Sequence, residues 1–433
     1  MRILKTTQTY YPYLNKGGPP AKVKGIARAL ARRGHEVTVL TADLGDKVEA
    51  LDLQEWSRER TKGEWGWEWQ HEGVRTIYLP TLGNYRATTI SPRVFKFCDR
   101  NLTQFDVVHL YGFYDLIGPT VARLSRRSGV PYVIEPLGMF RPRVRSLRKK
   151  RVYHRVVGNS LFHNAAAIIA TSETERQELI DGGIAAEKIL LRRNGLDLDE
   201  FQSLPVRGAL RSKLGIGERE PVVLFLGRLS FIKGLDLLVQ AFSRIEALRA
   251  LPDRPTPAGW GPRGRATAPR LIIAGPDDQD GSLEAIRALI DQLNLSGRVD
   301  ITGPLYGTAK RQAFTDADLF VLPSKSESFG NAAAESIASG VPVLVTRGCG
   351  IASLIDERAG LTVECTVEGL RAGLERLLND NALSARLRAG CAGVAQELSW
   401  DEPIDQMERM YSSLIATADR SRPVAVAQSQ VSP

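Results

Sequence analysis

Two glutamates eight residues apart bracket a turn whose chemistry suits a ligand with both phosphates and hydroxyls. In SESFGNAAAESIASGVP, Glu327 precedes an expected helix and Glu335 lies inside it, with Phe329, Gly330 and Asn331 between them. Free amides at a helix start attract phosphate, but carboxylates repel it unless they accept hydrogen bonds from neutral hydroxyls. The pattern favours a nucleotide sugar, which has hydroxyls on both sides of a diphosphate. The alternative is a dipole-favoured Glu327 and a surface Glu335.

Two cations follow a buried strand in the same half of the chain. In LFLGRLSFIKGLD, Arg228 comes directly after the apolar run 222–227, and Lys233 stands five residues further on. Open parallel sheets bind ligands at the carboxyl ends of their strands. Arginine can grip a diphosphate with two donors and lysine adds a point charge, so the pair could neutralise a leaving group. Two solvated loop cations are the alternative.

A glycine pair, Gly17 and Gly18, separates an expected opening strand from the helix expected over 21–35. Glycine lets the backbone approach a ligand closely, and the helix start would attract an anion. On its own the pair could equally form a tight turn, and it does not have the GxGxxG form of a dinucleotide site.

No metal cofactor is expected. Asp278-Gln279-Asp280 looks like a DxD metal motif, but it falls in a turn after the strand expected over 270–275. Because Arg228 and Lys233 can neutralise a diphosphate, the reaction would not need a metal. The 4 cysteines lack CxxC or Cys/His ligand spacing, which indicates reduced thiols.

The elements that must position these residues form two α/β sets. Short apolar runs alternate with helical patterns and Gly-bearing turns, as is typical of doubly wound parallel sheets. The expected strands are 37–40, 106–110, 131–135, 166–171, 222–227, 270–275, 317–323 and 341–346. An Asn-Gly turn within 192–201 marks the boundary between the sets. We therefore predict an α/β fold with two doubly wound domains, over 1–192 and 193–398.

Three segments depart from that pattern. The Pro/Gly/Arg-rich stretch 250–269 predicts an inserted loop, and 419–433 predicts a disordered tail. The tryptophan-rich stretch 44–72 predicts a hairpin or a loop over a substrate cleft.

Length, composition and charge narrow the class of protein. With 433 residues and 43% hydrophobic content, two globular domains are expected. The opening MRILKTTQTYYPY lacks an apolar signal core and the chain lacks an 18-residue apolar run, so a cytoplasmic protein is expected. Residues 1–190 hold 30 Lys and Arg against 19 Asp and Glu, which accounts for the whole net charge of +9. The first half should therefore face an anionic surface or substrate.

The densest basic segment is FRPRVRSLRKKRVYHRVV. Anionic lipids attract such clusters by about 1 kcal/mol per cation, and the apolar residues make no clean stripe for insertion. Peripheral contact with the inner face of the plasma membrane is one interpretation, and a soluble basic helix is the other. The cations are Arg141, Arg143, Arg145, Arg148, Lys149, Lys150, Arg151 and Arg155.

Taken together, the motifs resemble glycosyltransferase family 4, a family of retaining enzymes with the GT-B fold. The resemblance rests on PSKSESFGNAAAESIASGVPVLVT, GRLSFIKG, the NGLD turn, YYPYLNKGGP and LARRGHEVTVLT, in the family's order over nearly the whole chain. It implies two Rossmann-like domains facing across a cleft, with the acceptor bound by the first and the nucleotide sugar by the second. It also implies a last helix, over 399–418, that returns to the first domain.

The resemblance assigns roles residue by residue. Glu327 would bind hydroxyls of the donor sugar, and Glu335 would bind the ribose. Arg228 and Lys233 would bind the diphosphate. The remaining assignments are Phe329, Gly330 and Asn331 to the sugar and phosphate, Gly17 and Gly18 to the donor pocket, and Thr302, Gly303 and Pro304 to the nucleobase.

The chain departs from the family pattern at two positions in the first domain. Relatives often have a second histidine where Tyr111 stands, and another where Leu137 precedes Gly138. His109 is the histidine that remains at that edge. It could contact a sugar or be a core histidine with satisfied hydrogen bonds.

Several functions remain open at this point. A retaining glycosyltransferase could use a lipid-linked saccharide acceptor, as in bacterial surface polysaccharide assembly, or a soluble small molecule. A nucleotide-sugar epimerase of the GT-B fold would need acid/base groups, and the chain has only 5 histidines. The basic charge suggests nucleic-acid binding as a further function. No nucleic-acid motif accompanies the charge, however, so no nucleic-acid partner is expected.

Overall fold

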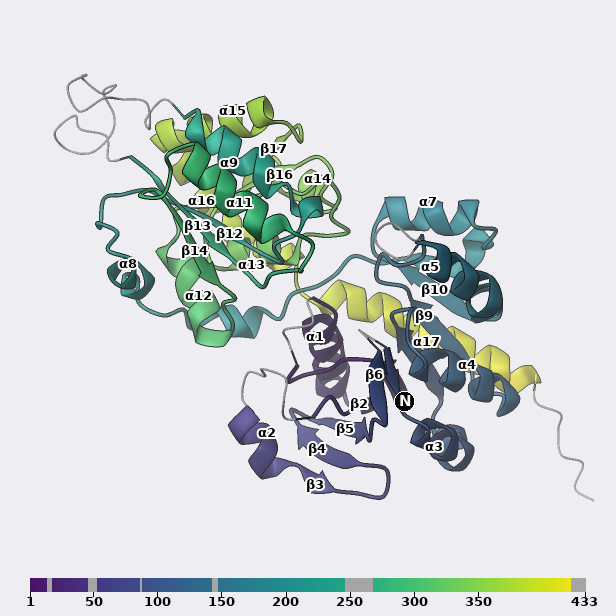
Figure 1. Cartoon of the computed structure of the whole chain (residues 1–433). Helices are drawn as coiled ribbons and strands as arrows, with labels where there is room; N and C mark the ends of the chain where they lie inside the picture. The colour runs from purple at the N-terminus through teal and green to yellow at the C-terminus, as the bar shows by residue number, and fades with distance from the viewer. Residues whose placement is uncertain (14–17, 46–52, 86–87, 142–146, 246–267, 422–433) are drawn as a thin grey trace, which may run out of the picture. The chain divides into compact units, whose positions relative to one another are not determined.

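The computed structural model describes residues 1–13, 18–45, 53–85, 88–141, 147–245 and 268–421 (Figure 1). The chain forms two compact units, Met1–Arg193 together with Trp400–Pro433, and Asn194–Ser399. Each division lies one residue beyond the boundary predicted from the sequence. Most of the insertion predicted over 250–269 lies outside the described residues.

The first unit is built on a nine-stranded sheet. Its strands, in spatial order, are β11 (Ile189–Leu191), β10 (Ala167–Ala170), β9 (Tyr132–Glu135), β8 (Val107–Tyr111), β1 (Arg2–Thr7), β2 (Glu36–Ala42), β5 (Val74–Leu79), β4 (Trp67–His71) and β3 (Thr61–Lys62). The order from β11 to β5 is parallel throughout, whereas β4 and β3 join antiparallel at one edge. The antiparallel pair matches the hairpin predicted in the tryptophan-rich stretch. A separate small hairpin is formed by β6 (Gly83–Tyr85) and β7 (Thr88–Ile90).

Helices accompany this sheet. They are α1 (Gly18–Arg32), α2 (Leu53–Glu59), α3 (Arg93–Asn101), α4 (Ile117–Arg127), α5 (Leu147–Tyr153), α6 (Asn159–His163), α7 (Glu173–Asp181) and α17 (Asp401–Ser421). Short turns of tighter or wider helix are η2 (Leu102–Gln104), η3 (His154–Gly158) and η4 (Ala186–Lys188).

The central strands of the first unit are buried on both faces. Successive side chains point to opposite sides of a sheet, so each of these strands contributes residues to two cores. Ile3 packs into one hydrophobic core and Leu4 into the other. Continuous apolar runs, rather than alternating ones, are what such doubly covered parallel strands require.

The last helix, α17, closes one of these two cores. Ile404, Met407 and Tyr411 are completely buried in the core that contains Ile3. Their spacing of three and four residues places them on one face of a helix. The helix extends to Ser421, so residues 419–421 are helical and not part of the predicted tail; the rest of that tail lies outside the described residues.

The second unit is a six-stranded, fully parallel sheet. Its strands, in spatial order, are β14 (Val299–Gly303), β13 (Arg270–Ala274), β12 (Val222–Leu226), β15 (Leu319–Leu322), β16 (Val343–Thr346) and β17 (Gly360–Val363). Its helices are α8 (Ala209–Lys213), α9 (Leu235–Ser243), α11 (Ser282–Gln292), α12 (Gly307–Asp316), α13 (Asn331–Ala338), α14 (Ala352–Ile355), α15 (Val367–Asn379) and α16 (Asn381–Glu397), with short turns η5 (Leu198–Phe201) and η6 (Phe231–Lys233). The strand order reverses between β12 and β15, and such a switch point is where open α/β sheets bind ligands.

Candidate active site

Glu327 is fixed by its backbone at the switch point of the second unit. It follows β15, and its amide donates to the Gly348 carbonyl at 3.0 Å. Its own carbonyl accepts from the Gly350 amide at 2.9 Å, so the segment pairs with the loop after β16. A Cβ at Gly350 would lie 2.2 Å from the Ser328 carbonyl oxygen, so this approach requires glycine. The Glu327 side chain is thereby held at the carboxyl edge of the sheet.

Lys233 lies against this carboxylate. It ends η6, the short turn after β12, and its Nζ donates to Glu327 Oε2. The next residue, Gly234, has a φ of 66° and sits so close to Pro323 that a Cβ would lie 2.2 Å from its carbonyl oxygen. The side chains of Lys233 and Glu327 are 16% and 20% exposed, so the pair is partly shielded yet reachable. The structure brings these two predicted site residues together.

The second glutamate of the pair also has a lysine partner. Glu335 lies in α13, and its Oε1 accepts from Lys310 Nζ of α12 at 2.8 Å. The two side chains are 16% and 24% exposed. The repulsion expected between a carboxylate and a diphosphate is therefore offset at both glutamates by an adjacent cation.

The turn between the two glutamates starts α13 through Gly330, which has a φ of 108°. Phe329 packs its ring into the hydrophobic core, and its carbonyl accepts from Ile351 at 2.8 Å. Its ring is therefore a packing group. Asn331 is the first residue of the helix, and its Oδ1 accepts from Asn194 Nδ2 at 3.3 Å.

Arg228 stands at the end of β12, half exposed, and its guanidinium pairs with Asp278 at 2.9 Å. Asp280 accepts from the Phe231 amide at 3.3 Å and from the Ser282 amide at 3.0 Å. Both carboxylates of the DxD-like turn thus have partners within the second unit. Over the ranges that the structure describes, no group of three or more His, Cys, Asp or Glu side chains is arranged to hold a metal ion.

The predicted nucleobase segment lies at the carboxyl end of β14. Gly303 has a φ of 76°, and its carbonyl accepts from the Gly275 amide at 2.9 Å. Thr302 donates through Oγ1 to the same carbonyl at 3.0 Å. Gly303 is therefore on the edge of the sheet that also carries Lys233 and Glu327.

The predicted residues of the first unit are placed differently. Gly17 lies outside the described residues, and Gly18 is the exposed first residue of α1. His109 is completely buried, with Nδ1 2.5 Å from the Tyr411 hydroxyl of α17 and 3.2 Å from the Tyr111 hydroxyl. Burial, together with Lys5 and Arg192, holds its pKa well below the ordinary value. These contacts favour the core interpretation of His109 over a sugar contact.

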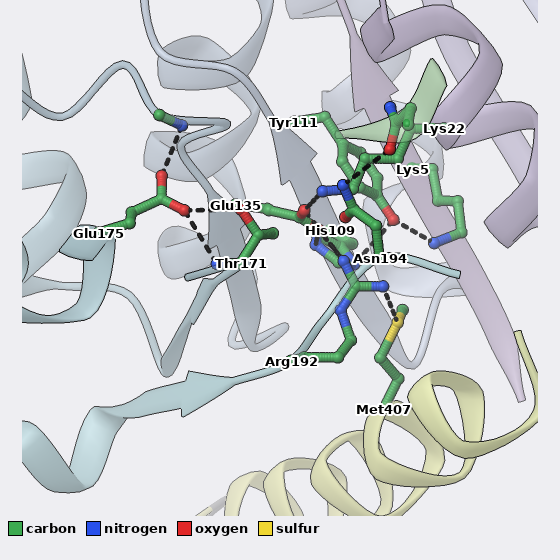
Figure 2. A network of polar contacts seen from close by, with 12 residues as sticks. Lys5, Lys22, His109, Tyr111, Glu135, Thr171, Glu175, Arg192, Asn194 and Met407 are labelled. Carbon is green, nitrogen blue, oxygen red and sulfur yellow. Dashed lines mark hydrogen bonds and ion pairs between the residues drawn. The ribbon is translucent and has the colours of Figure 1, made fainter. Parts of the chain in front are cut away.

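Figure 2 shows the polar network that surrounds His109. Glu135, at the end of β9, accepts from Arg192 at 2.9 and 3.0 Å and pairs with Lys22 of α1. Lys5 donates to the Tyr111 hydroxyl at 2.7 Å. Although burial alone would raise the pKa of Glu135, Arg192 and Lys22 outweigh it and hold the pKa below its ordinary value. One carboxylate therefore serves as the buried counter-charge for the surrounding cations.

The basic segment of the first unit is partly described. Arg148, Arg151 and Arg155 are exposed, and beside them Val152 and Val156 are 63% and 71% exposed. Arg141 is exposed too and pairs with Asp181 at 2.8 Å. Arg143 and Arg145 lie outside the described residues, as do the side chains of Lys149 and Lys150. Among the helices that the structure describes, none has the length and apolar character needed to cross a bilayer.

Two residues with contacts in this site were missed in the sequence. Lys310 looked like one of many surface cations on a helix, because its partner Glu335 is 25 residues away. The sequence places Asn194 in the NGLD boundary turn without a role in the site, yet it is 6% exposed and contacts Asn331 across 137 residues of sequence. The signal available for Asn194 was its place in the NGLD motif.

Comparisons with known proteins agree with this architecture. The model for "Glycosyl transferases group 1" matches residues 206–391, and that for "Glycosyl transferase 4-like domain" matches 17–195. A D-inositol 3-phosphate glycosyltransferase of Xylanimonas cellulosilytica is 27% identical over 432 residues, covering 94% of this chain and 93% of that protein.

Solved structures share the fold. HepE of Anabaena, in complex with UDP-glucose, has a TM-score of 0.71 at 20% identity and covers 95% of this chain and 100% of its own. The catalytic domain of starch synthase IV from Arabidopsis thaliana, bound to ADP and acarbose, has a TM-score of 0.71 at 17% identity. The match covers 96% of this chain and 99% of that domain. The two sheets and the family matches define a glycosyltransferase with the GT-B fold. Within that class, the chain belongs to glycosyltransferase family 4, as its motifs had implied.

Proposed function

We propose that the protein transfers a sugar from a nucleoside diphosphate sugar to a hydroxyl of a small anionic acceptor, with retention of the anomeric configuration. The observation that carries this proposal is the pairing of Lys233 with Glu327 beside the start of α13. A cation, helix amides and a carboxylate with a second oxygen to offer match the diphosphate and the hydroxyls of such a donor.

The chemistry follows from the groups present. The bond between the anomeric carbon and the leaving phosphate oxygen breaks, and a bond from that carbon to the acceptor oxygen forms on the same face. The proton of the acceptor hydroxyl passes to an oxygen of the leaving diphosphate. Lys233, Arg228 and the amides of α13 stabilise the charge that develops on the diphosphate, which is commonly the largest single contribution to such a rate. No metal is assigned a role.

A small anionic acceptor is supported from two sides. The relative from Xylanimonas cellulosilytica is described as acting on D-inositol 3-phosphate. The first 190 residues carry the entire positive excess of this chain, as an acceptor domain for an anion would.

The direct test supplies candidate donors and an acceptor and follows both products by NMR. UDP-, GDP- and ADP-linked hexoses are offered with inositol 3-phosphate as acceptor. We expect one donor to yield nucleoside diphosphate and a glycoside of unchanged anomeric configuration in equal amounts. Conversion of the donor sugar to its epimer, with no glycoside formed, would contradict transfer and support the epimerase alternative.

A lipid-linked acceptor is the second candidate, and exposed residues on and after α5 favour it. Val152 and Val156 are four residues apart, so on a helical stretch they share a face, and exposed arginines lie beside them. Apolar side chains among cations suit the interface of an anionic membrane, where each cation adds about 1 kcal/mol of attraction.

Liposome co-sedimentation tests this second candidate. Replacing Arg148, Arg151 and Arg155 with glutamine should weaken binding to vesicles of anionic phospholipid, and raised salt should do the same because exposed charges are screened. A matched control on α3 changes three other exposed cations to glutamine: Arg93, Lys96 and Arg100. Equal binding by both triple variants would reject docking through the basic segment.

A further inference from the structure

Among the described residues, one oxygen of the second glutamate of the pair accepts a hydrogen bond and the other does not. Glu335 Oε1 accepts from Lys310 Nζ at 2.8 Å, while Oε2 receives no hydrogen bond from the residues that the structure describes. Glu327 has the same arrangement, with Oε2 bound to Lys233 and Oε1 left over within the described ranges. Each carboxylate is therefore oriented by a lysine and keeps one acceptor oxygen available.

Lys310 itself is held in a defined place. Its amide donates to the Tyr306 carbonyl at 3.1 Å, in the first turn of α12, and α12 begins four residues after Gly303 at the end of β14. The lysine thus links the edge expected to hold the nucleobase with the helix that carries Glu335.

The burial of this pair separates it from ordinary surface ion pairs of the same unit. Lys310 and Glu335 are 24% and 16% exposed, whereas Arg347 and Glu364 are 67% and 68% exposed. Exposed ion pairs such as Arg347–Glu364 contribute little free energy, so they fix little geometry. A partly shielded pair restricts the carboxylate to fewer orientations.

We propose that Lys310 is a positioning residue for recognition of the donor's ribose. It binds Oε1 of Glu335 and so aims Oε2 at a ribose hydroxyl, and it offsets the negative charge that Glu335 would otherwise place near the diphosphate. The inference rests on the proposed function, because it requires a nucleoside diphosphate in the second unit. Lys310 acts through Glu335 and takes no part in bond making.

The test compares affinity for nucleotides with and without a ribose hydroxyl. UDP, GDP and ADP, each with its 2′-deoxy and 3′-deoxy counterparts, are titrated into wild type and Lys310→Met by calorimetry. Wild type should prefer one ribonucleotide over a deoxy counterpart by at least about tenfold, since a hydrogen bond to a charged group is lost. In Lys310→Met the ratio of the two affinities should fall towards one, because affinity for the ribonucleotide drops more than affinity for its deoxy counterpart.

Matched variants separate positioning from damage to the fold. Lys310→Arg should restore most of the preference, and Lys213→Met, which changes an exposed lysine of α8, should leave it intact. Glu335→Gln should lose the preference too, and combining it with Lys310→Met should add little further loss.

Each outcome decides something. An undiminished ribose preference in Lys310→Met would overturn the positioning role while leaving the proposed donor site standing. Failure of wild type to bind any of the nucleoside diphosphates would instead overturn the proposed function, and this inference with it.

Discussion

Lys233 and Glu327, which are 94 residues apart in the sequence, form a hydrogen-bonded ion pair at the carboxyl ends of neighbouring strands. The pair explains how a carboxylate can stand beside a site for a diphosphate. Its lysine offers charge to the leaving group, and its glutamate keeps an oxygen for a sugar hydroxyl. The Lys310–Glu335 pair repeats the arrangement at the other end of the motif.

Transfer should not depend on a divalent metal. Asp278 is paired with Arg228 and Asp280 with backbone amides, so the DxD-like turn is engaged by protein groups. We expect turnover in excess EDTA to stay within about twofold of the untreated rate, since leaving-group charge is assigned to cationic side chains. Loss of turnover in EDTA that added manganese restores would contradict this and implicate the two aspartates.

Removing the buried counter-charge of the first unit should destabilise it strongly. Glu135→Gln leaves Lys22 and Arg192 without a carboxylate, and breaking a buried pair in this way costs about 3–5 kcal/mol. Chemical denaturation at pH 7 measures the difference from wild type. As a control, Glu364→Gln removes a partner of the exposed Arg347 and should cost less than about 1 kcal/mol.

The same variant carries a pH signature. The pKa of Glu135 is lowered in the folded protein, so its ionised form contributes stability above the unfolded pKa, and that contribution is lost as pH falls through the folded pKa. The difference in free energy of unfolding between wild type and Glu135→Gln should therefore have its full value at pH 7 and shrink below about pH 4. A stability difference that does not change with pH would mean that Glu135 stabilises the fold through packing and not through its charge.

Asp115 should make stability depend on pH in the opposite sense. Burial raises its pKa to about 6, and its carboxylate accepts from the Gly118 amide at 2.6 Å in the first turn of α4. The folded state then keeps a proton that the unfolded chain has released, so this contribution to stability falls as pH rises from about 4 to about 6.

The variant Asp115→Asn keeps an acceptor oxygen for Gly118 and removes the titration. Relative to this variant, wild type should lose about 2 kcal/mol between pH 4 and pH 6.5, because the loss approaches about 1.4 kcal/mol per pH unit only between the unfolded and folded pKa values. Thermal melts across that range provide the measurement. Parallel curves for the two proteins would show that Asp115 titrates normally.

Much of the fold could be predicted because buried parallel strands leave a simple mark. Apolar runs such as 222–227 and 341–346 became β12 and β16, where both faces are covered and no alternation is needed. The strands that were missed carry polar residues or glycine. Gly360–Val363 and Val299–Gly303 are examples. Pairing and packing with neighbouring strands stabilise these segments, although their own residues are a weak signal for a strand.

The candidate site was predictable only where side chains are close in sequence or belong to a family motif. Glu327, Glu335 and Lys233 belong to such motifs, whereas the contact between Lys310 and Glu335 depends on two helices meeting in space. His109 shows that a residue's position in a motif does not reveal what surrounds its side chain. Its place in a strand could not reveal that Tyr411, 302 residues later, would cover it.

The most direct measurement is the turnover of Lys233→Met with the donor and acceptor that the wild type uses. Lys233 is assigned to the charge that develops on the leaving diphosphate, so we expect kcat to fall by about 10²–10³-fold. The melting temperature should stay near that of wild type, because the side chain is outside the core, and Lys213→Met should retain full activity. A folded Lys233→Met protein with the kcat of wild type would contradict the assignment of this site to sugar transfer.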